Sequence, residues 1–292
     1  MSRNSQMLRP DVIVDKIEKP GVAMRHSRLS WWQRALRQDG LRRGLLLLLM
    51  AAAWEGYGRY VDNDLVLPTL SAVLQALFKS FTDGVMPGRV WNSMAMLLKG
   101  YTIGVICAMV ITTLAITTKL GNDLLTTLTA MLNPLPAIAL LPLALLWFGV
   151  GSGSILFVVA HSILWPLALN VHAGYQSVSE TLRMAGRNAG LQPISYVARV
   201  LFPAALPSVI SGLKLSWAFG WRTLIAAELV FGASSSGGGI GWFIFSKRND
   251  LEIPDVFAGL LVIVLIGLAM EGLVFRELER RTVRRWGMLR SG

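Results

Sequence analysis

Residues 176–208 read QSVSETLRMAGRNAGLQPISYVARVLFPAALPS and separate two long apolar blocks of the chain. This stretch is too long for a simple turn and too polar to enter a membrane. Ser177 or Ser179 can cap a helix, and Gly190 followed by Pro193 can end it. The stretch therefore predicts a short helix outside the apolar blocks, where one of its faces can contact a soluble partner.

The composition is that of a membrane protein. Of the 292 residues, 53% are hydrophobic and only 15% are charged, and the apolar residues fall in long blocks. A soluble chain of this length would need more charge to cover its surface. The net charge of +11 is better explained by basic residues that set the orientation of the chain in the membrane than by nucleic-acid binding. The apolar blocks leave little solvated surface for a basic face.

Six stretches are long and apolar enough to cross a bilayer as helices, which takes about 20 residues. They are roughly residues 44–61, 90–117, 123–147, 154–173, 206–230 and 256–275. The sequence therefore predicts an all-α polytopic membrane protein with six transmembrane helices. Pro134, Pro136 and Pro142 interrupt the third stretch, and such breaks are tolerated only where protein or a water-filled cavity satisfies the freed carbonyls.

Basic residues predict the orientation. Ten of them precede the first span and six lie in the tail from Arg276 onward, so the positive-inside rule predicts that both termini are cytoplasmic. The even number of spans agrees and leaves residues 62–89 and 231–255 outside. In the first of these loops, Pro68 and Thr69 begin LPTLSAVLQALFKSF, whose helical repeat predicts a surface helix.

Three parts of the chain follow from this topology. Residues 1–43 form a cytoplasmic N-terminal segment, and its SRLSWWQRALRQDG predicts an interfacial elbow helix at about residues 28–39. Residues 44–275 form the six-helix domain, with residues 177–207 in the cytoplasm. Residues 276–292 form a basic cytoplasmic tail.

Ionisable side chains inside the spans are costly and should face protein or water. Lys99 and Arg222, the latter beside Trp221, lie deep enough to line a path for an anion, and Glu228 is a further candidate path residue. The sequence leaves open an internal ion pair of either cation with Glu55 or Glu228. Those two carboxylates lie near outer helix ends, where snorkelling or a structural role is the simpler interpretation.

Motifs for catalysis and metal binding do not occur in the sequence. Without a Walker motif or paired carboxylates in a solvated domain, no residue is a catalytic candidate, and the chain cannot hydrolyse ATP. His161 and His172 have no Cys, Asp or Glu at ligand spacing, which favours core or interface histidines over a metal site. The single cysteine, Cys107, lies in an apolar block and forms no CxxC pair.

Two glycine patterns indicate structure rather than chemistry. Gly100, Gly104 and Ala108 form a small-residue stripe that lets another helix approach, in the same chain or in a second copy. The run ASSSGGGIGW, residues 233–242, has the glycines of a phosphate cradle but no GK[ST], and predicts a flexible loop outside the membrane.

The polar stretch resembles the permease subunits of binding-protein-dependent ABC importers, whose signature is EAA, three residues, Gly, nine residues and IxLP. The matching positions are Met184, Ala185, Gly186, Gly190, Val200, Leu201, Phe202 and Pro203. The spacing is intact, while four residue types depart from the signature: Met184 for Glu, Gly186 for Ala, Val200 for Ile and Phe202 for Leu. PLPAIALLPLALLWFGVG, LFPAALPSVISGLKL and GWRTLIAAELVFG look like the nitrate, sulfonate and taurine permeases, and the likeness covers roughly residues 45–275.

The resemblance implies a type I ABC importer permease-like fold that moves a small anion, such as nitrate, taurine, a sulfonate or an organic acid, by alternating access. It implies a homodimer in the lipid of the bacterial inner membrane, two ATPase subunits beneath it, and a periplasmic or lipid-anchored binding protein above it. ATP and Mg would bind to the ATPase, and this chain would bind no cofactor, no metal and no nucleic acid.

The same resemblance assigns the segment around Gly190 as the coupling helix. The residues expected to contact the ATPase are Glu180, Arg183, Met184, Ala185, Gly186, Arg187, Gly190 and Pro203. A neutral Met184 cannot make the charged contact of the family's glutamate, so Glu180, Arg183 or Arg187 is expected to supply it.

Two other classes of function are alternatives. A gradient-driven secondary transporter or channel would need inverted repeats, which the two halves of the sequence do not show. A non-transporting membrane scaffold would co-purify with no ATPase. The choice among nitrate, taurine, sulfonates, aromatic carboxylates and neutral pyrimidine precursors is not readable from these residues.

Overall fold

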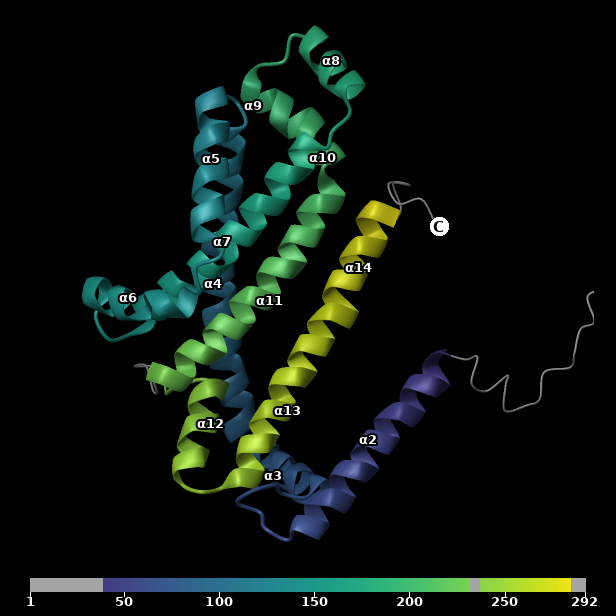
Figure 1. Cartoon of the computed structure of the whole chain (residues 1–292), viewed down its shortest axis with the longest axis vertical. Coiled ribbons are helices and arrows are strands. Elements are labelled where there is room, and N and C mark those ends of the chain that lie inside the picture. Colours follow the sequence, from purple (N-terminus) through teal and green to yellow (C-terminus); the bar gives the residue numbers. More distant parts are fainter. Residues whose placement is uncertain (1–38, 232–236, 285–292) are drawn as a thin grey trace, which may run out of the picture. The chain divides into compact units, whose positions relative to one another are not determined.

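The computed structural model describes residues 39–231 and 237–284, and these residues form helices and their connections, with no strand (Figure 1). The chain divides into two compact units, residues 1–51 and 52–292. The predicted elbow helix at about residues 28–39 falls outside the described residues, apart from its last residue. The end of the basic tail also lies outside them.

The α-helices are α2 (Asp39–Val61), α3 (Leu70–Thr82), α4 (Val85–Ala115), α5 (Lys119–Leu132), α6 (Leu141–Phe148), α7 (Ser152–Gln176), α8 (Glu180–Asn188), α9 (Pro193–Tyr196), α10 (Phe202–Ala204), α11 (Leu206–Phe231), α12 (Ile240–Asn249), α13 (Ile253–Ala269) and α14 (Arg276–Glu279). A 3₁₀ turn, η1 (Ala137–Leu140), precedes α6. Wider π-type turns are η2 (Val197–Leu201), η3 (Met270–Phe275) and η4 (Arg280–Arg284).

By length and composition, three helices in the described part of the chain can cross a membrane: α4, α7 and the helix from Ile253 to Thr282. Two bent pairs pass the same test together. They are α5 with Ala137–Phe148, bent by 90°, and Pro193–Ala204 with α11, bent by 79°, so the described residues offer three to five spans. The predicted first span, α2, is not among them. Six spans and cytoplasmic termini stay predictions.

The central helix of residues 52–292 is α7, which packs against α4 and α11. In its most apolar stretch 61% of the residues are buried, compared with 22% for α4 and 17% for Ile253–Thr282. Ile163 and Leu167 of α7 are completely buried. The outer helices keep broad exposed apolar faces, as expected of helices that meet lipid or other membrane helices.

Two glycines of α4 bring its backbone against α7. A Cβ atom on Gly100 would lie 2.6 Å from Cγ1 of Val159, and one on Gly104 would lie 2.8 Å from Cγ2 of Ile163. Ala108, the third member of the small-residue stripe, is completely buried. The sequence does not say whether the helix that packs on this small-residue stripe belongs to the same chain or to a second copy. The structure places α7 of the same chain against it.

The predicted interruption of the third span is confirmed at Pro134 and Pro136. Helix α5 ends at Leu132, and the chain turns by 90° before η1 and α6 begin. Pro142 lies in the first turn of α6, where a missing N–H removes no intrahelical bond.

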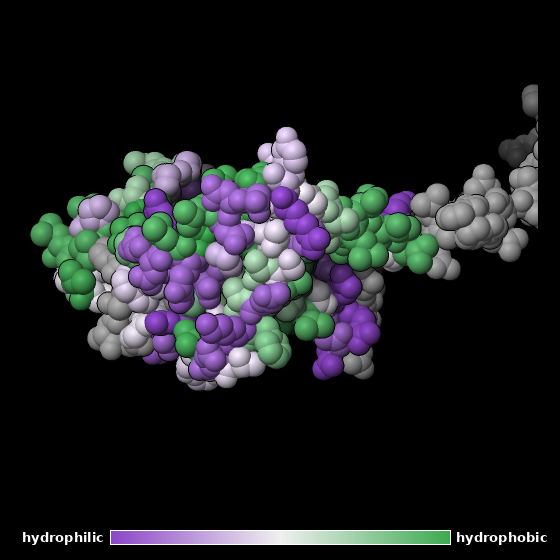
Figure 2. Space-filling model, turned by 90° about the horizontal axis from the view of Figure 1, so that it is seen from below, coloured by the Kyte–Doolittle hydropathy of each residue, from purple (hydrophilic) through white to green (hydrophobic). Residues whose placement is uncertain are grey.

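Helices α8 and α9 lie at one end of the second unit, and α3 and α12 lie at the other (Figure 1). Thr69 begins α3 as predicted, because its Oγ1 accepts a hydrogen bond of 3.3 Å from the amide of Ala72. Seen from the α3–α12 end, hydrophilic side chains cover a broad area with hydrophobic ones at its margins (Figure 2). This end carries the loops predicted to lie outside the membrane.

We expect Gly104→Ala to destabilise the protein by about 1 to 3 kcal/mol, because the added methyl group overpacks the contact with Ile163. Thermal unfolding of the detergent-solubilised protein measures the effect. Gly88→Ala is the matched control in the same helix, since nothing lies within 4 Å of a Cβ atom there. Equal melting temperatures for the two variants would contradict the close contact.

Candidate functional site

The polar segment 177–207 forms α8, α9, η2 and α10. Ser179 is the residue before α8, as predicted, although its side chain makes no capping hydrogen bond. After Asn188 the backbone leaves the helix, and Gly190 has a φ of +67°, a left-handed conformation that favours glycine. The helix ends before Gly190, as predicted. Pro193 takes no direct part in that end and instead begins α9, because its fixed φ suits the first turn of a helix.

Arg183 joins α8 to the central helix. Its Nη2 donates a hydrogen bond of 2.6 Å to the carbonyl oxygen of Tyr175, and its Nε donates one of 3.1 Å to the carbonyl oxygen of Val178. Carbonyls at the end of a helix have no partner within it, so the bond to Tyr175 caps α7, and the bond to Val178 fixes the turn that follows it. Sequence reasoning assigns Arg183 to a partner protein, whereas the structure shows a contact within the chain.

Gly186 joins α8 to the stretch that leads into α11. A Cβ atom on Gly186 would lie 2.8 Å from Cε2 of Tyr196 and 3.1 Å from Cγ2 of Val200. The helix can rest on the tyrosine ring only because this position has no side chain. This contact accounts for glycine at a position where the family signature has alanine.

The rest of α8 is largely exposed, and its accessible side chains are both polar and apolar. Leu182 is 48% exposed and Met184 is 55% exposed. Glu180, Ala185 and Arg187 are exposed as well, whereas Gly186 is buried. A short exposed helix, held to the end of α7 and to the stretch that leads into α11, can fill the cleft of another protein. Gly190 is exposed beyond the helix, and Pro203 is half-buried in α10.

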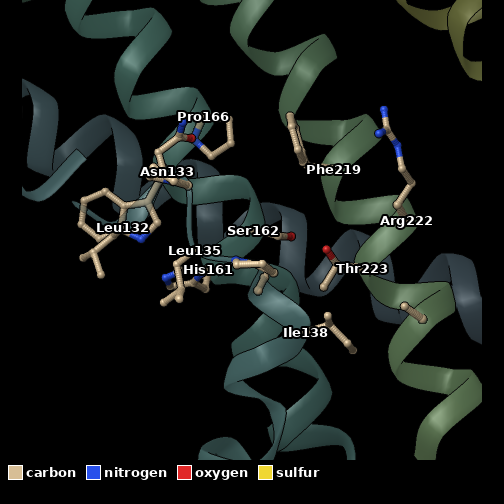
Figure 3. A pocket seen from close by; sticks show the side chains of 15 residues that line it. Leu132, Asn133, Leu135, Ile138, His161, Ser162, Pro166, Phe219, Arg222 and Thr223 are labelled. Carbon is tan, nitrogen blue, oxygen red and sulfur yellow. The ribbon is translucent and has the colours of Figure 1, made fainter. Parts of the chain in front are cut away.

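A pocket of about 410 Å³ lies where the third span breaks (Figure 3). Its walls come from the break between α5 and α6, from α7 and from α11. The lining residues are Leu132, Asn133, Pro134, Leu135, Pro136, Ala137, Ile138, His161, Ser162, Trp165, Pro166, Phe219, Arg222, Thr223 and Ala226. The broken backbone thus borders a cavity, which is the setting that such a break requires.

Arg222 lies at the rim of this pocket. Its guanidinium carbon is 5.4 Å from the centre of the Phe219 ring, a cation–π contact. In Figure 3 the guanidinium extends away from Ser162 and Thr223. The Arg222 side chain is exposed, so its positive charge is accessible on the side of α11 that faces away from the pocket.

The other candidate path residues do not line the pocket. Lys99 is exposed on α4, and Trp221 is 7% exposed and packs in the core. Among residues 39–231 and 237–284, neither Lys99 nor Arg222 makes an ion pair. Glu55 instead pairs with Arg59, with 2.7 Å between Nη2 and Oε1, and accepts a hydrogen bond from the amide of Ser71.

Glu228 fixes the start of α12. This carboxylate is 5% exposed and accepts hydrogen bonds of 2.8 Å from Oγ of Ser93 and from the amide of Gly241. A Cβ atom on Gly239 would lie 2.1 Å from Oγ of Ser93, so only glycine fits there. The prediction of a flexible loop is wrong for the end of the glycine-rich run, because Ile240 begins a helix and the glycines pack on this carboxylate.

The far end of α12 carries an ion pair outside the spans. Lys247 donates a hydrogen bond to Glu252, which raises the pKa of the lysine ammonium. Within the described ranges no cluster of three His, Cys, Asp or Glu side chains can hold a metal ion.

Apolar helices, a broken span beside a mainly apolar pocket and an exposed helix at one end are typical of a membrane transport subunit. The chain belongs to the family described as "Binding-protein-dependent transport system inner membrane component", whose model matches residues 91–283. This membership confirms the resemblance seen in the signature and makes the chain a multi-pass inner-membrane protein.

Individual relatives belong to the branch indicated by the sequence. The chain is 30% identical over 263 residues to the taurine transport system permease protein TauC of Escherichia coli, covering 88% of this chain and 94% of that one. It is 29% identical to the putative aliphatic sulfonates transport permease protein SsuC of Bacillus subtilis, covering 85% and 89%. It is 27% identical to the nitrate import permease protein NrtB of Synechocystis, covering 65% and 68%.

We expect Arg183→Ala to loosen α8, because the carbonyls at the end of α7 lose donors worth about 1 to 3 kcal/mol together. Hydrogen–deuterium exchange across residues 177–190 should quicken in this variant. Arg187→Ala, one turn further along the exposed face, is the matched control and should exchange like the unsubstituted protein. Faster exchange in both variants alike would argue against the cap.

Proposed function

We propose that the chain is the permease subunit of an ATP-driven importer and moves a small anion of the taurine, sulfonate, nitrate or organic-acid kind across the inner membrane by alternating access. The observation that carries this proposal is the exposed helix α8, held to the end of α7 and to the stretch that leads into α11, in a member of a transport family. The printed functions of the relatives support the class of anion.

The proposed complex contains two copies of this chain, two ATPase subunits and a separate binding protein. ATP and Mg bind to the ATPase, whose closure displaces α8. Residues Leu182, Met184 and Ala185 supply the apolar contact, and Arg187 and Glu180 supply charge at its margin. Arg183 acts through α7 as a positioning residue, since its guanidinium is engaged with carbonyls of the same chain.

Two routes connect α8 to the pocket. Arg183 attaches α8 to α7, while Gly186 seats it on Tyr196, whose helix continues through a bend of 79° into α11. Both long helices line the pocket at the span break. Displacement of α8 therefore moves two walls of the same cavity, which is the two-state element that alternating access requires.

Leu182→Asp should weaken association with the partner ATPase at least about tenfold, since it removes a buried apolar anchor from the interface and introduces a charge. Co-purification of the solubilised complex, with bound ATPase quantified, measures this. Leu120→Asp is the control, because Leu120 is also an exposed leucine, 80% accessible, in the first turn of α5.

The same preparation tests the class of function. ATP-dependent accumulation of taurine, nitrate or alkanesulfonates in proteoliposomes that contain the complex and its binding protein is the expected result. Flux driven by a gradient through the chain alone would instead favour a secondary transporter. A preparation that never retains an ATPase would support a scaffold.

Arg222→Ala should lower anion uptake about tenfold, because a cation near the path contributes about 1.5 to 3 kcal/mol to a contact with an anion. ATPase activity without ligand should stay near normal. Arg222→Lys, which keeps the charge, should retain more uptake than the alanine variant, and Lys99→Ala tests the second candidate cation separately. Normal uptake by Arg222→Ala would remove Arg222 from the path.

A further inference from the structure

We infer that Lys214 and Glu271 form an exchangeable ion pair in the anion path. The lysine ammonium binds Glu271 while the path is empty, and it binds the anion while the anion passes. This inference rests on the proposed function and adds a second cation to Arg222. Glu271 is a positioning residue, because it holds the ammonium and does not itself contact the anion.

The ion pair joins two membrane helices. Nζ of Lys214 contacts a carboxylate oxygen of Glu271, and the two side chains are 47% and 51% exposed. Lys214 lies in α11 and Glu271 lies in η3, and each belongs to a stretch that is long and apolar enough to cross a membrane. Charges in such stretches are too costly to face lipid, so the exposed side of this pair meets water or protein.

The exposed residues of α11 lie on one side of the helix. Lys214, Ala218 and Arg222 follow one another at four-residue spacing. Leu215 and Phe219 lie beside them and are 43% and 41% exposed. In Figure 3 the Arg222 side chain extends from the helix away from the pocket. Two cations about 12 Å apart along the helix axis therefore share an open face.

The charge of this face suits an anion. Glu228, the one acidic residue of α11, is 5% exposed and accepts hydrogen bonds from Ser93 and Gly241, so it does not contribute to the face. The two cations of α11 stand against the single carboxylate that η3 brings to Lys214. One positive charge is left in excess, and one monovalent anion neutralises it.

The ion pair is suited to an exchange of partners. A pair between half-exposed side chains contributes little net free energy, because water solvates both groups well. The ammonium of Lys214 is a point charge on a flexible four-carbon stem, so it can turn from Glu271 to an anion without a movement of α11. The carboxylate, which is half exposed already, is then solvated by water.

The backbone beneath the pair is fixed from two sides. The hydroxyl of Tyr101 in α4 donates a hydrogen bond of 2.9 Å to the carbonyl oxygen of Leu213. Trp217 packs edge-to-face on Tyr101, with 5.3 Å between the ring centroids, and on Phe275, with 6.3 Å. Opening the ion pair therefore changes two side chains while the helices that carry them stay packed.

The test measures ATP-dependent uptake by proteoliposomes that contain the permease–ATPase complex and its binding protein. The probe is whichever of taurine, nitrate and butanesulfonate the unsubstituted complex imports. Lys214→Gln should lower uptake at least about tenfold, because the anion loses a charged contact, and Lys214→Arg should retain more. Lys119→Gln, at an exposed lysine in the first turn of α5, is the control and should import normally.

Glu271→Gln distinguishes the path from a structural role. It leaves the ammonium of Lys214 free for the anion, so uptake should be retained. An ion pair that only holds the helices together is broken equally by Lys214→Gln and by Glu271→Gln, and would predict equal losses of uptake. Thermal unfolding of both variants checks that each one folds.

Chemical modification compares two charges in one folded protein. Lys214→Cys, combined with Cys107→Ala, is treated with water-soluble methanethiosulfonates that add either an ammonium or a sulfonate group. We expect the ammonium adduct to restore part of the uptake and the sulfonate adduct to restore none. The Cys107→Ala protein, treated in the same way, is the control.

Three results would overturn the inference: normal uptake by Lys214→Gln, equal losses in Lys214→Gln and Glu271→Gln, or a Lys214→Cys variant that does not react with the water-soluble reagents. If Lys214→Gln does not assemble, the comparison of the two adducts still decides. The proposed function fails separately, when the unsubstituted complex imports none of the three anions with ATP.

Discussion

The close contact of α4 with α7 through Gly100 and Gly104 is the interaction on which the other elements depend. In a membrane, apolar side chains gain little by leaving lipid for another helix, because lipid tails are equally apolar. Close approach of the backbones and good packing therefore decide which helices associate. With α4 in contact along one side, α7 is enclosed on the other by α11 and becomes the most buried helix. The Arg183 cap, the pocket and the contact of Ser93 with Glu228 all lie on α7 or on these two neighbours.

That central position also explains why the third span can break. A lipid-exposed break would leave backbone groups without partners, at a cost of several kcal/mol each. Here Pro134 and Pro136 lie against α7 and α11, and the space left between them is the pocket. The irregular backbone therefore borders the cavity, and α8 is joined to one enclosing helix, α7, directly and to the other, α11, through α9 and η2.

Hydropathy and helix-end chemistry predict the local structure well. The long apolar helices, the proline break, the helix after Thr69 and the short polar helix before Gly190 follow from patterns within a few turns of chain. The sites depend on contacts that no local pattern encodes. Ser93 and Glu228 are 135 positions apart, and the carboxylate could equally have faced a cation or the interface. A tryptophan beside Pro166 and opposite a broken span is the one signal that could have indicated the pocket.

Met184 has a consequence for how complexes of this protein behave in solution. Coulombic contacts at a surface weaken as salt is added, because the screening length falls to about 3 Å at 1 M ionic strength. Met184 is 55% exposed on α8, at the position where the family signature has a carboxylate. The docking proposed above therefore has one charged contact fewer at this position, and such an assembly should lose less affinity in high salt than one that keeps the carboxylate.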